Sequence, residues 1–179
     1  MKIYKQEHID CLRNAIISNA DIAYTAIQKS LSAMSPLQFF ATVKFEKIGR
    51  DPIEGQEQNL IEQINQMYSD LVVLAAAEDL LKQFPGITLE LHLGAASGYD
   101  IESLDGSVVA ECFSVTSVSS NRKLYKDCQK LLQTTAPIKC IYFYSHNDSE
   151  SKLLSQFSKY PDIRFHRVSF DALQASTLS

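Results

Sequence analysis

The hydrophobic period of the chain changes at Pro85-Gly86, and this change constrains the fold most. Before it, apolar residues recur at helical spacing over residues 57–84, which predicts the longest helix of the chain. After it, residues 87–93 alternate apolar and polar side chains, as does a strand with one buried face. A long helix followed directly by strands predicts a fold that mixes both kinds of element in one core.

Two further strand patterns follow at residues 97–103 and 108–115, joined by Asp105-Gly106, a dipeptide typical of tight hairpin turns. The pattern ends with a helix, an apolar strand, a short helix and a last strand, at residues 121–133, 138–144, 149–160 and 163–170. A helix between two apolar strands favours a crossover with parallel pairing. The sequence therefore predicts an α/β fold of the α+β type, with a mixed sheet that contains a three-strand meander.

The first fifty residues predict a helical extension, residues 1–50, packed on a core of residues 51–179. Within it, residues 6–34 show two apolar faces separated by cap residues near Asn19, which predicts two short helices. Ser35-Pro36 is typical of a helix start, and the following residues form a short helix or a turn that passes into an extended segment. Residues 49–55 predict a loop.

Bulk composition limits the classes of function. A net charge of -4 and a pI near 5.5 argue against a protein that coats nucleic acid through its overall charge, which leaves only a local basic surface. The four cysteines are widely spaced, so reduced and mostly buried thiols in a cytoplasmic protein are expected. No apolar run reaches the roughly 18 residues that a membrane-spanning helix needs, and no membrane partner is expected.

Two acids lie in apolar surroundings on the predicted hairpin. Alternation along VVAECFSV places Glu111 on the same face as Val109 and Phe113. Folding about the Asp105-Gly106 turn pairs residues whose numbers sum to about 211, so Glu111 faces Asp100 to within a residue or two. An ionised carboxylate in such a layer requires a compensating group.

Two kinds of compensation are consistent with this pattern. Facing carboxylates suit a hard divalent ion such as Mg²⁺ or Mn²⁺, and such an ion can activate water against a phosphodiester. Alternatively, the acids are structural and bind backbone donors or a lysine. Spacing alone favours the structural interpretation over the metal site.

The order of elements resembles that of the PD-(D/E)XK nuclease superfamily, which has the restriction-endonuclease-like fold. The matching residues are Asp100, in the segment GYDI, and Glu111, in the triplet Glu111-Cys112-Phe113, and the resemblance covers residues 57–144. It implies a three-layer core with N-terminal helices. It also implies a metal-dependent nuclease that acts on DNA, with Mg²⁺ or Mn²⁺ bound by Asp100 and Glu111.

The sequence departs from the family pattern at two positions. Tyr99 replaces the usual proline, and Phe113 stands at the lysine position of the triplet. That lysine is expected to orient the attacking water and stabilise developing charge, which a phenylalanine cannot do. In some members of the superfamily the lysine comes from the next helix, and Lys123 is the candidate for this role here.

The resemblance implies further site residues. An acid from the first core helix is expected near the metal, for which Glu62 is the best match and Glu57 and Gln63 are rivals. The side chains expected to contact nucleic acid are Arg122, Lys126 and Lys130. Solvated helix faces would explain the same charges equally simply.

Three functions remain open at this stage. The first is a metal-dependent nuclease with DNA as its partner. The second is a catalytically inactive nuclease-fold protein that binds nucleic acid or acts as a scaffold, because Phe113 removes a catalytic group. The third is an α/β interaction module whose acids are structural. A homodimer is considered for each of them.

Overall fold

Helices and strands alternate in the computed structural model, which describes residues 1–3, 5–94, 98–119, 122–169 and 171. The helices are α1 (Gln6–Ala33), α2 (Pro36–Phe45), α3 (Leu60–Gln83), α4 (Lys123–Leu132) and α5 (Glu150–Phe157). The strands are β1 (Lys2–Ile3), β2 (Gly49–Arg50), β3 (Glu57–Gln58), β4 (Leu89–Leu91), β5 (Ile101–Ser103), β6 (Val108–Val115), β7 (Ile138–Ser145) and β8 (Arg164–Arg167). The predicted mixed α/β fold is confirmed.

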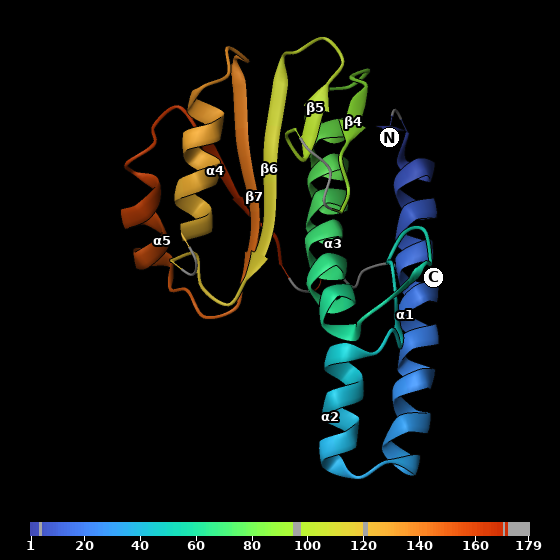
Figure 1. Cartoon of the computed structure of the whole chain (residues 1–179). Coiled ribbons are helices and arrows are strands. Elements are labelled where there is room, and N and C mark those ends of the chain that lie inside the picture. Colours follow the sequence, from blue (N-terminus) through green and yellow to red (C-terminus); the bar gives the residue numbers. More distant parts are fainter. Residues whose placement is uncertain (4, 95–97, 120–121, 170, 172–179) are drawn as a thin grey trace.

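The main sheet, as far as the described residues define it, has six strands in the order β1-β4-β5-β6-β7-β8 (Figure 1). Strands β1, β4, β5 and β6 pair antiparallel, which includes the predicted meander. Strands β6, β7 and β8 pair parallel, with α4 and α5 as the crossovers. The predicted parallel pairing around a crossover helix is therefore confirmed.

Helices cover both faces of this sheet, α1 and α3 on one and α4 and α5 on the other (Figure 1). The alternation of β6 divides its side chains between two apolar clusters. Ala110 and Cys112 pack in the cluster under α1 and α3, whereas Val109 and Phe113 pack in the cluster under α4. Glu111 shares the α4 face with Val109 and Phe113, as the alternation predicts.

The prediction of two helices over residues 6–34 was wrong, because this segment forms the single helix α1. The polar residues at the expected break make tertiary contacts instead of capping a helix. The Asn19 side-chain amide donates to the carbonyl of Pro52 at 3.0 Å, and the Asn19 carbonyl accepts from Gln63 Nε2 at 3.2 Å. Without glycine or proline at the break, the helix continues through it.

Three short strands were not predicted from the sequence. β1 pairs with β4 at one edge of the main sheet and buries Ile3 completely. β2 and β3 form a separate two-stranded sheet, so part of the predicted loop at residues 49–55 is extended and paired. Strands of two residues are too short to show a period of two in the sequence.

Local signals set the ends of the helices largely as expected. The Asn59 side chain accepts from the amide of Glu62 at 2.9 Å and caps α3, which ends just before Pro85-Gly86. The segment after Ser35, left open above, forms helix α2. Three predicted end residues lie outside the described residues: Ser97, Asn121 and Phe170.

None of the helices in the described part of the chain is both long and apolar enough to cross a membrane. The four cysteines are free, and Cys112, Cys128 and Cys140 are buried while Cys11 is exposed. The expectation of free, mostly buried thiols is therefore confirmed.

Candidate active site on the β5–β6 hairpin

The turn between β5 and β6 is held by local polar contacts. Asp105 Oδ1 accepts from the amide of Ser107 at 3.0 Å and from the hydroxyl of Ser103 at 2.6 Å. Gly106 adopts a φ of 71°, a conformation that glycine reaches without steric cost. These contacts fix which residue of β5 faces which residue of β6.

The register of the hairpin is the one predicted from the turn. Ile101 lies opposite Ala110, and these two residue numbers sum to 211. The same register brings Asp100, just before β5, to the level of Glu111. The Asp100 carboxylate reaches across to β6 and accepts from the backbone amide of Cys112 at 2.6 Å.

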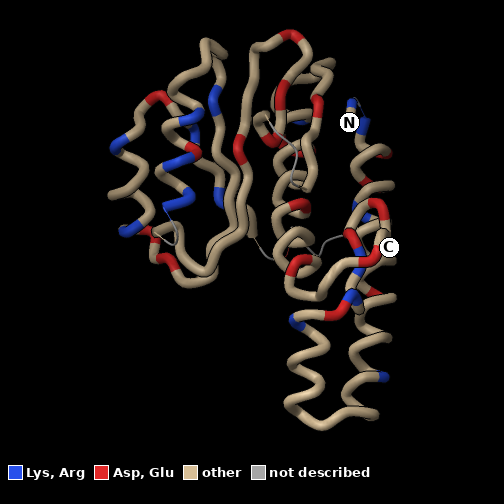
Figure 2. The backbone as a smooth tube through the Cα atoms, viewed as in Figure 1, with Lys and Arg blue, Asp and Glu red and all other residues tan. Residues whose placement is uncertain are grey.

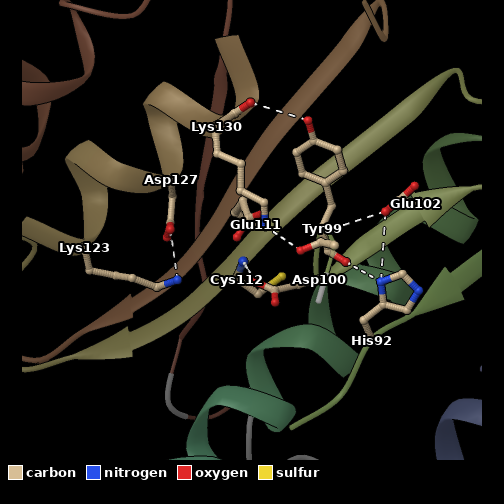
Figure 3. A network of polar contacts seen from close by, with 10 residues as sticks. His92, Tyr99, Asp100, Glu102, Glu111, Cys112, Lys123, Asp127 and Lys130 are labelled. Atoms are coloured by element: carbon tan, nitrogen blue, oxygen red, sulfur yellow. Dashed lines mark hydrogen bonds and ion pairs between the residues drawn. The ribbon is translucent and has the colours of Figure 1, made fainter. Parts of the chain in front are cut away.

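Glu111 is a buried acid with one close cation. Its side chain is 3% exposed, and Lys130 Nζ lies 2.5 Å from its Oε1 (Figure 3). Burial raises the pKa of Glu111 in spite of the Lys130 ammonium, and the charges of Asp100 and Asp127 raise it further. Lys130 therefore compensates the charge of Glu111 only in part, because the neighbouring acids Asp100 and Asp127 oppose its ionisation.

Lys130 connects α4 to the start of β5. Besides Glu111, its ammonium donates to the carbonyl of Gly98 and lies 4.9 Å from the centre of the Tyr99 ring. The Tyr99 hydroxyl in turn donates to the Lys130 carbonyl at 3.4 Å. Lys130, expected to contact nucleic acid, is thus placed at the hairpin acids instead of extending freely into solvent (Figure 3).

Lys123, the candidate for the missing lysine, makes its closest ion pair with a different acid. Its ammonium lies 2.9 Å from Oδ1 of Asp127, a buried residue one turn further along α4. Burial raises the pKa of Asp127 against the effect of Lys123. Burial acts to lower the pKa of Lys123, but the Asp127 carboxylate outweighs it and the pKa is raised. Asp127 was not singled out in the sequence, although its spacing of four residues from Lys123 is a signal for an ion pair.

Phe113, at the lysine position of the triplet, is a core residue. It is 2% exposed, and its ring stacks on that of Phe143 with centroids 5.9 Å apart. Its side chain therefore belongs to the apolar cluster under α4. Any cation at this site must come from another element.

The acid of α3 that acts electrostatically on the hairpin is Asp70. Glu62 lies in the exposed first turn of α3, about two helical turns before Asp70. Asp70 is 2% exposed and accepts from the amide of Gly94 at 3.2 Å. Burial raises its pKa to about 6, and the charges of Asp51 and Asp100 contribute to this rise. Asp70 directly precedes the apolar run of α3, and this position is the sequence signal that could have identified it.

The two rivals of Glu62 have structural contacts. Glu57 lies in β3 and forms an ion pair with Arg50 at 3.5 Å. Gln63 is buried, accepts from the amide of Arg50 at 2.9 Å and donates to the carbonyl of Asn19. Gln63 therefore links α3 to β2 and α1, whereas Glu57 pairs across the small β2–β3 sheet.

The remaining basic residues lie on the exposed side of α4. Arg122 and Lys126 are exposed, and the Arg122 guanidinium lies 5.2 Å from the centre of the Tyr125 ring. Figure 2 shows several Lys and Arg positions along α4. Among the described residues, Arg122 and Lys126 form no ion pair with Asp100 or Glu111, and Lys130 is the lysine paired with Glu111.

The charges around the hairpin do not balance. Asp100 lies within electrostatic range of three other carboxylates, those of Asp70, Glu111 and Asp127. Lys123 and Lys130 supply two ammonium groups against these four carboxylates, and burial raises the pKa of Asp70, Glu111 and Asp127, which favours their protonated forms. A divalent cation beside these carboxylates would favour their ionised forms.

In the part of the chain that the structure describes, the hairpin offers at most two carboxylates to a metal ion, those of Asp100 and Glu111. Within the described residues, no group of three or more His, Cys, Asp or Glu side chains could hold a metal ion. Asp100 and Glu111 would supply two carboxylate ligands at one level of the hairpin. Mg²⁺ is commonly bound by one or two carboxylates, with water and substrate phosphate as its other ligands.

Comparison of this chain with protein-family models, with curated proteins and with solved structures gives no match. The functional argument therefore rests on the geometry of the hairpin acids and their lysines.

Proposed function

We propose that the protein is a metal-dependent nuclease that acts on DNA phosphodiesters, a divergent member of the PD-(D/E)XK superfamily. One observation carries the proposal. The β5–β6 register brings Asp100 to the level of Glu111, and a lysine ammonium lies 2.5 Å from the Glu111 carboxylate. Paired acids and a lysine are the groups that metal-assisted phosphodiester hydrolysis requires.

Each residue has a proposed role. Asp100 and Glu111 hold Mg²⁺ or Mn²⁺, and the bound ion supplies an activated water and neutralises charge on the phosphate. Lys130 provides the cation that Phe113 cannot, and it stabilises the negative charge that develops on the phosphoryl oxygens. Lys123 favours the ionised form of Asp127, which lies within electrostatic range of Glu111.

The proposed partner is DNA, bound by exposed cations of α4. Arg122 and Lys126 are exposed and close in sequence to Lys123 and Lys130, so a phosphate backbone that contacts them would pass the hairpin acids. We place the protein in the cytoplasm, where its free thiols remain reduced. We also propose a homodimer, because two sites would allow both strands of a duplex to be cut.

A cleavage assay tests the proposal. Supercoiled and linear DNA are incubated with the protein and Mg²⁺ or Mn²⁺, and cleavage is expected to fall about 100-fold or more in Asp100→Asn and in Glu111→Gln. Glu102→Gln is the matched control, since Glu102 lies on the same hairpin, is half-buried and keeps its acceptor oxygen. Cleavage that persists in Glu111→Gln would come from a different site or protein and would overturn the assignment.

The same assay separates the two lysines. Lys130→Met is expected to lose cleavage about 100-fold, while Lys123→Met, whose partner is Asp127, is expected to lose less. The reverse order would identify Lys123 as the catalytic lysine and would leave the roles of the acids intact.

A second function, an inactive nucleic-acid-binding protein, is favoured by one observation. The Lys130 ammonium is engaged by Glu111 and by the carbonyl of Gly98, as in a structural ion pair. In that case the wild-type protein would bind DNA in a salt-dependent manner, and Lys126→Ser would weaken binding, but no metal would produce cleavage.

A further inference from the structure

The second half of α1 and the whole of α2 form a helical hairpin that projects beyond the sheet (Figure 1). Ala23 is the last buried residue of α1, and α2 has no buried residue. A two-helix hairpin of this kind cannot enclose an apolar core by itself. Its apolar side chains therefore need a partner outside the fold.

One face of α2 is apolar and exposed. Leu37, Phe40 and Phe45 are 82%, 66% and 73% exposed. Leu37 and Phe40 are three residues apart and lie on one side of the helix, and Phe45 is its last residue. Leu31 and Met34, at the tip of the hairpin, are 58% and 40% exposed. Because large apolar side chains bury about 150–250 Å² each, these five expose on the order of 600 Å². A stable interface buries about 800 Å² on each partner, so this face approaches the required size.

The hairpin is almost free of charge. Lys29 is the only charged residue between Asp21 and Lys44 in the sequence, and Figure 2 shows this hairpin nearly without coloured segments. DNA and anionic lipid surfaces attract proteins through clustered cations, which this face lacks. An uncharged apolar face is best matched by another face of the same kind.

A second copy of the hairpin offers such a face. Two hairpins related by a two-fold axis and packed antiparallel form a four-helix bundle, in which apolar side chains of all four helices meet. This arrangement brings the tip of one hairpin to the base of the other. Lys29, towards the tip, then lies at the level of Asp21, nearer the base of the partner hairpin.

We propose that the hairpin formed by α1 and α2 is a dimer interface for a second copy of this chain, centred on the outer face of α2. Leu37 and Phe40 form the centre of the contact, and Leu31, Met34 and Phe45 form its edge. The two cores lie at opposite ends of the shared bundle. This interface does not depend on the nuclease activity proposed above.

Light scattering coupled to size exclusion tests the interface on the full chain, over about a hundredfold range of protein concentration. The wild type is expected to have twice the mass of one chain, and Phe40→Glu and Leu37→Glu are expected to have the mass of one chain. Leu154→Glu is the matched control, because Leu154 is 63% exposed on α5, and this variant should stay dimeric. Circular dichroism confirms that each variant remains folded.

Two results would overturn the interface. One is a wild type that is monomeric at every concentration. The other is a Phe40→Glu or Leu37→Glu variant that is folded and still dimeric. A monomeric wild type that floats with anionic phospholipid vesicles would show that the face binds lipid and not a second copy.

Discussion

Lys130 combines a structural and an electrostatic role at a single residue. Its side chain lies 40% exposed between the buried Glu111 and the carbonyl of Gly98, so it anchors the start of β5 to α4 while it compensates an acid. The pairing is incomplete, because the pKa of Glu111 remains raised by burial and by neighbouring acids.

Replacing Lys130 by methionine should destabilise the fold. The change keeps the length of the side chain but leaves Glu111 without its cation, which is expected to cost about 1–3 kcal/mol of unfolding free energy. Urea unfolding at neutral pH measures this loss. Lys126→Met, which removes an exposed lysine of the same helix, should change the free energy by less than about 0.5 kcal/mol. Equal losses in the two variants would contradict the burial argument.

Asp70 should make stability depend on pH. Its pKa in the fold is about 6, above its ordinary value of 3.8, so the folded state binds more protons than the unfolded state between these values. The stabilisation from Asp70 is therefore full below about pH 4 and is lost as pH rises through 6. From pH 4 to pH 7, Asp70→Asn should gain about 2 kcal/mol relative to the wild type.

Urea unfolding at several pH values checks this expectation, with Asp162→Asn as an exposed control in the loop before β8. The control should follow the wild type at each pH. Parallel profiles for Asp70→Asn and the wild type would show that Asp70 does not titrate near pH 6.

At the scale of elements, the caps of α3 and α5 provide a matched pair. The Asn59 side chain accepts from the amide of Glu62, whereas the Ser149 side chain accepts no hydrogen bond from the backbone of α5 and contacts the hydroxyl of Ser151 instead. Asn59→Ala should cost about 1 kcal/mol of unfolding free energy, and Ser149→Ala should cost clearly less. Thermal or urea unfolding measures both. A larger loss in Ser149→Ala would mean that local capping does not stabilise α3.

The β5–β6 hairpin could be predicted because its determinants are local. Asp105-Gly106 sets the turn, and the turn fixes the register that brings Asp100 to the level of Glu111. Alternation along β6 then fixes the face of the sheet on which Glu111 lies. The position of Lys130 could not be predicted in this way. The position of the Lys130 ammonium depends on how α4 packs across the sheet. This packing is non-local, and the spacing of residues along a helix does not predict it.

Helix α3 shows a similar limit. Its extent follows from its apolar period and its cap, but the sequence favoured the polar side of its first turn, where Glu62 is exposed. The acid that lies in range of the hairpin, Asp70, occupies a buried position beside the apolar stripe. A search for buried positions by their apolar residues does not identify a buried acid such as Asp70. The break predicted within α1 was wrong for a related reason, since Asn19 serves the junction with α3.

At the scale of the whole molecule, a bound metal should stabilise the fold by mass action. If Asp100 and Glu111 hold Mn²⁺, a concentration 100 times the dissociation constant adds about 2.7 kcal/mol of stability. Such a gain raises the melting temperature by roughly 5–10 °C for a chain of this size. Thermal melting without DNA measures it, with Asp100→Ala as the variant expected to show no shift.

Equal shifts in the wild type and in Asp100→Ala would place the metal elsewhere. No shift in either protein would remove the metal from the proposed function and would favour a binding or scaffold protein. Neither result bears on the dimer interface proposed for the α1–α2 hairpin, which is tested by measuring the mass of the protein in solution.

The hairpin turn at Asp105-Gly106 also has a consequence for the order in which the site forms. Asp100 and Glu111 are joined by a short segment with local contacts, and hairpins of this kind close within about 1–10 μs. Lys130 reaches them only when α4 packs across the sheet, a contact between residues 19 or more positions apart in the sequence. On topology alone, we therefore expect the two acids to meet before their cation arrives. Ions in solution would be available to the pair in that interval.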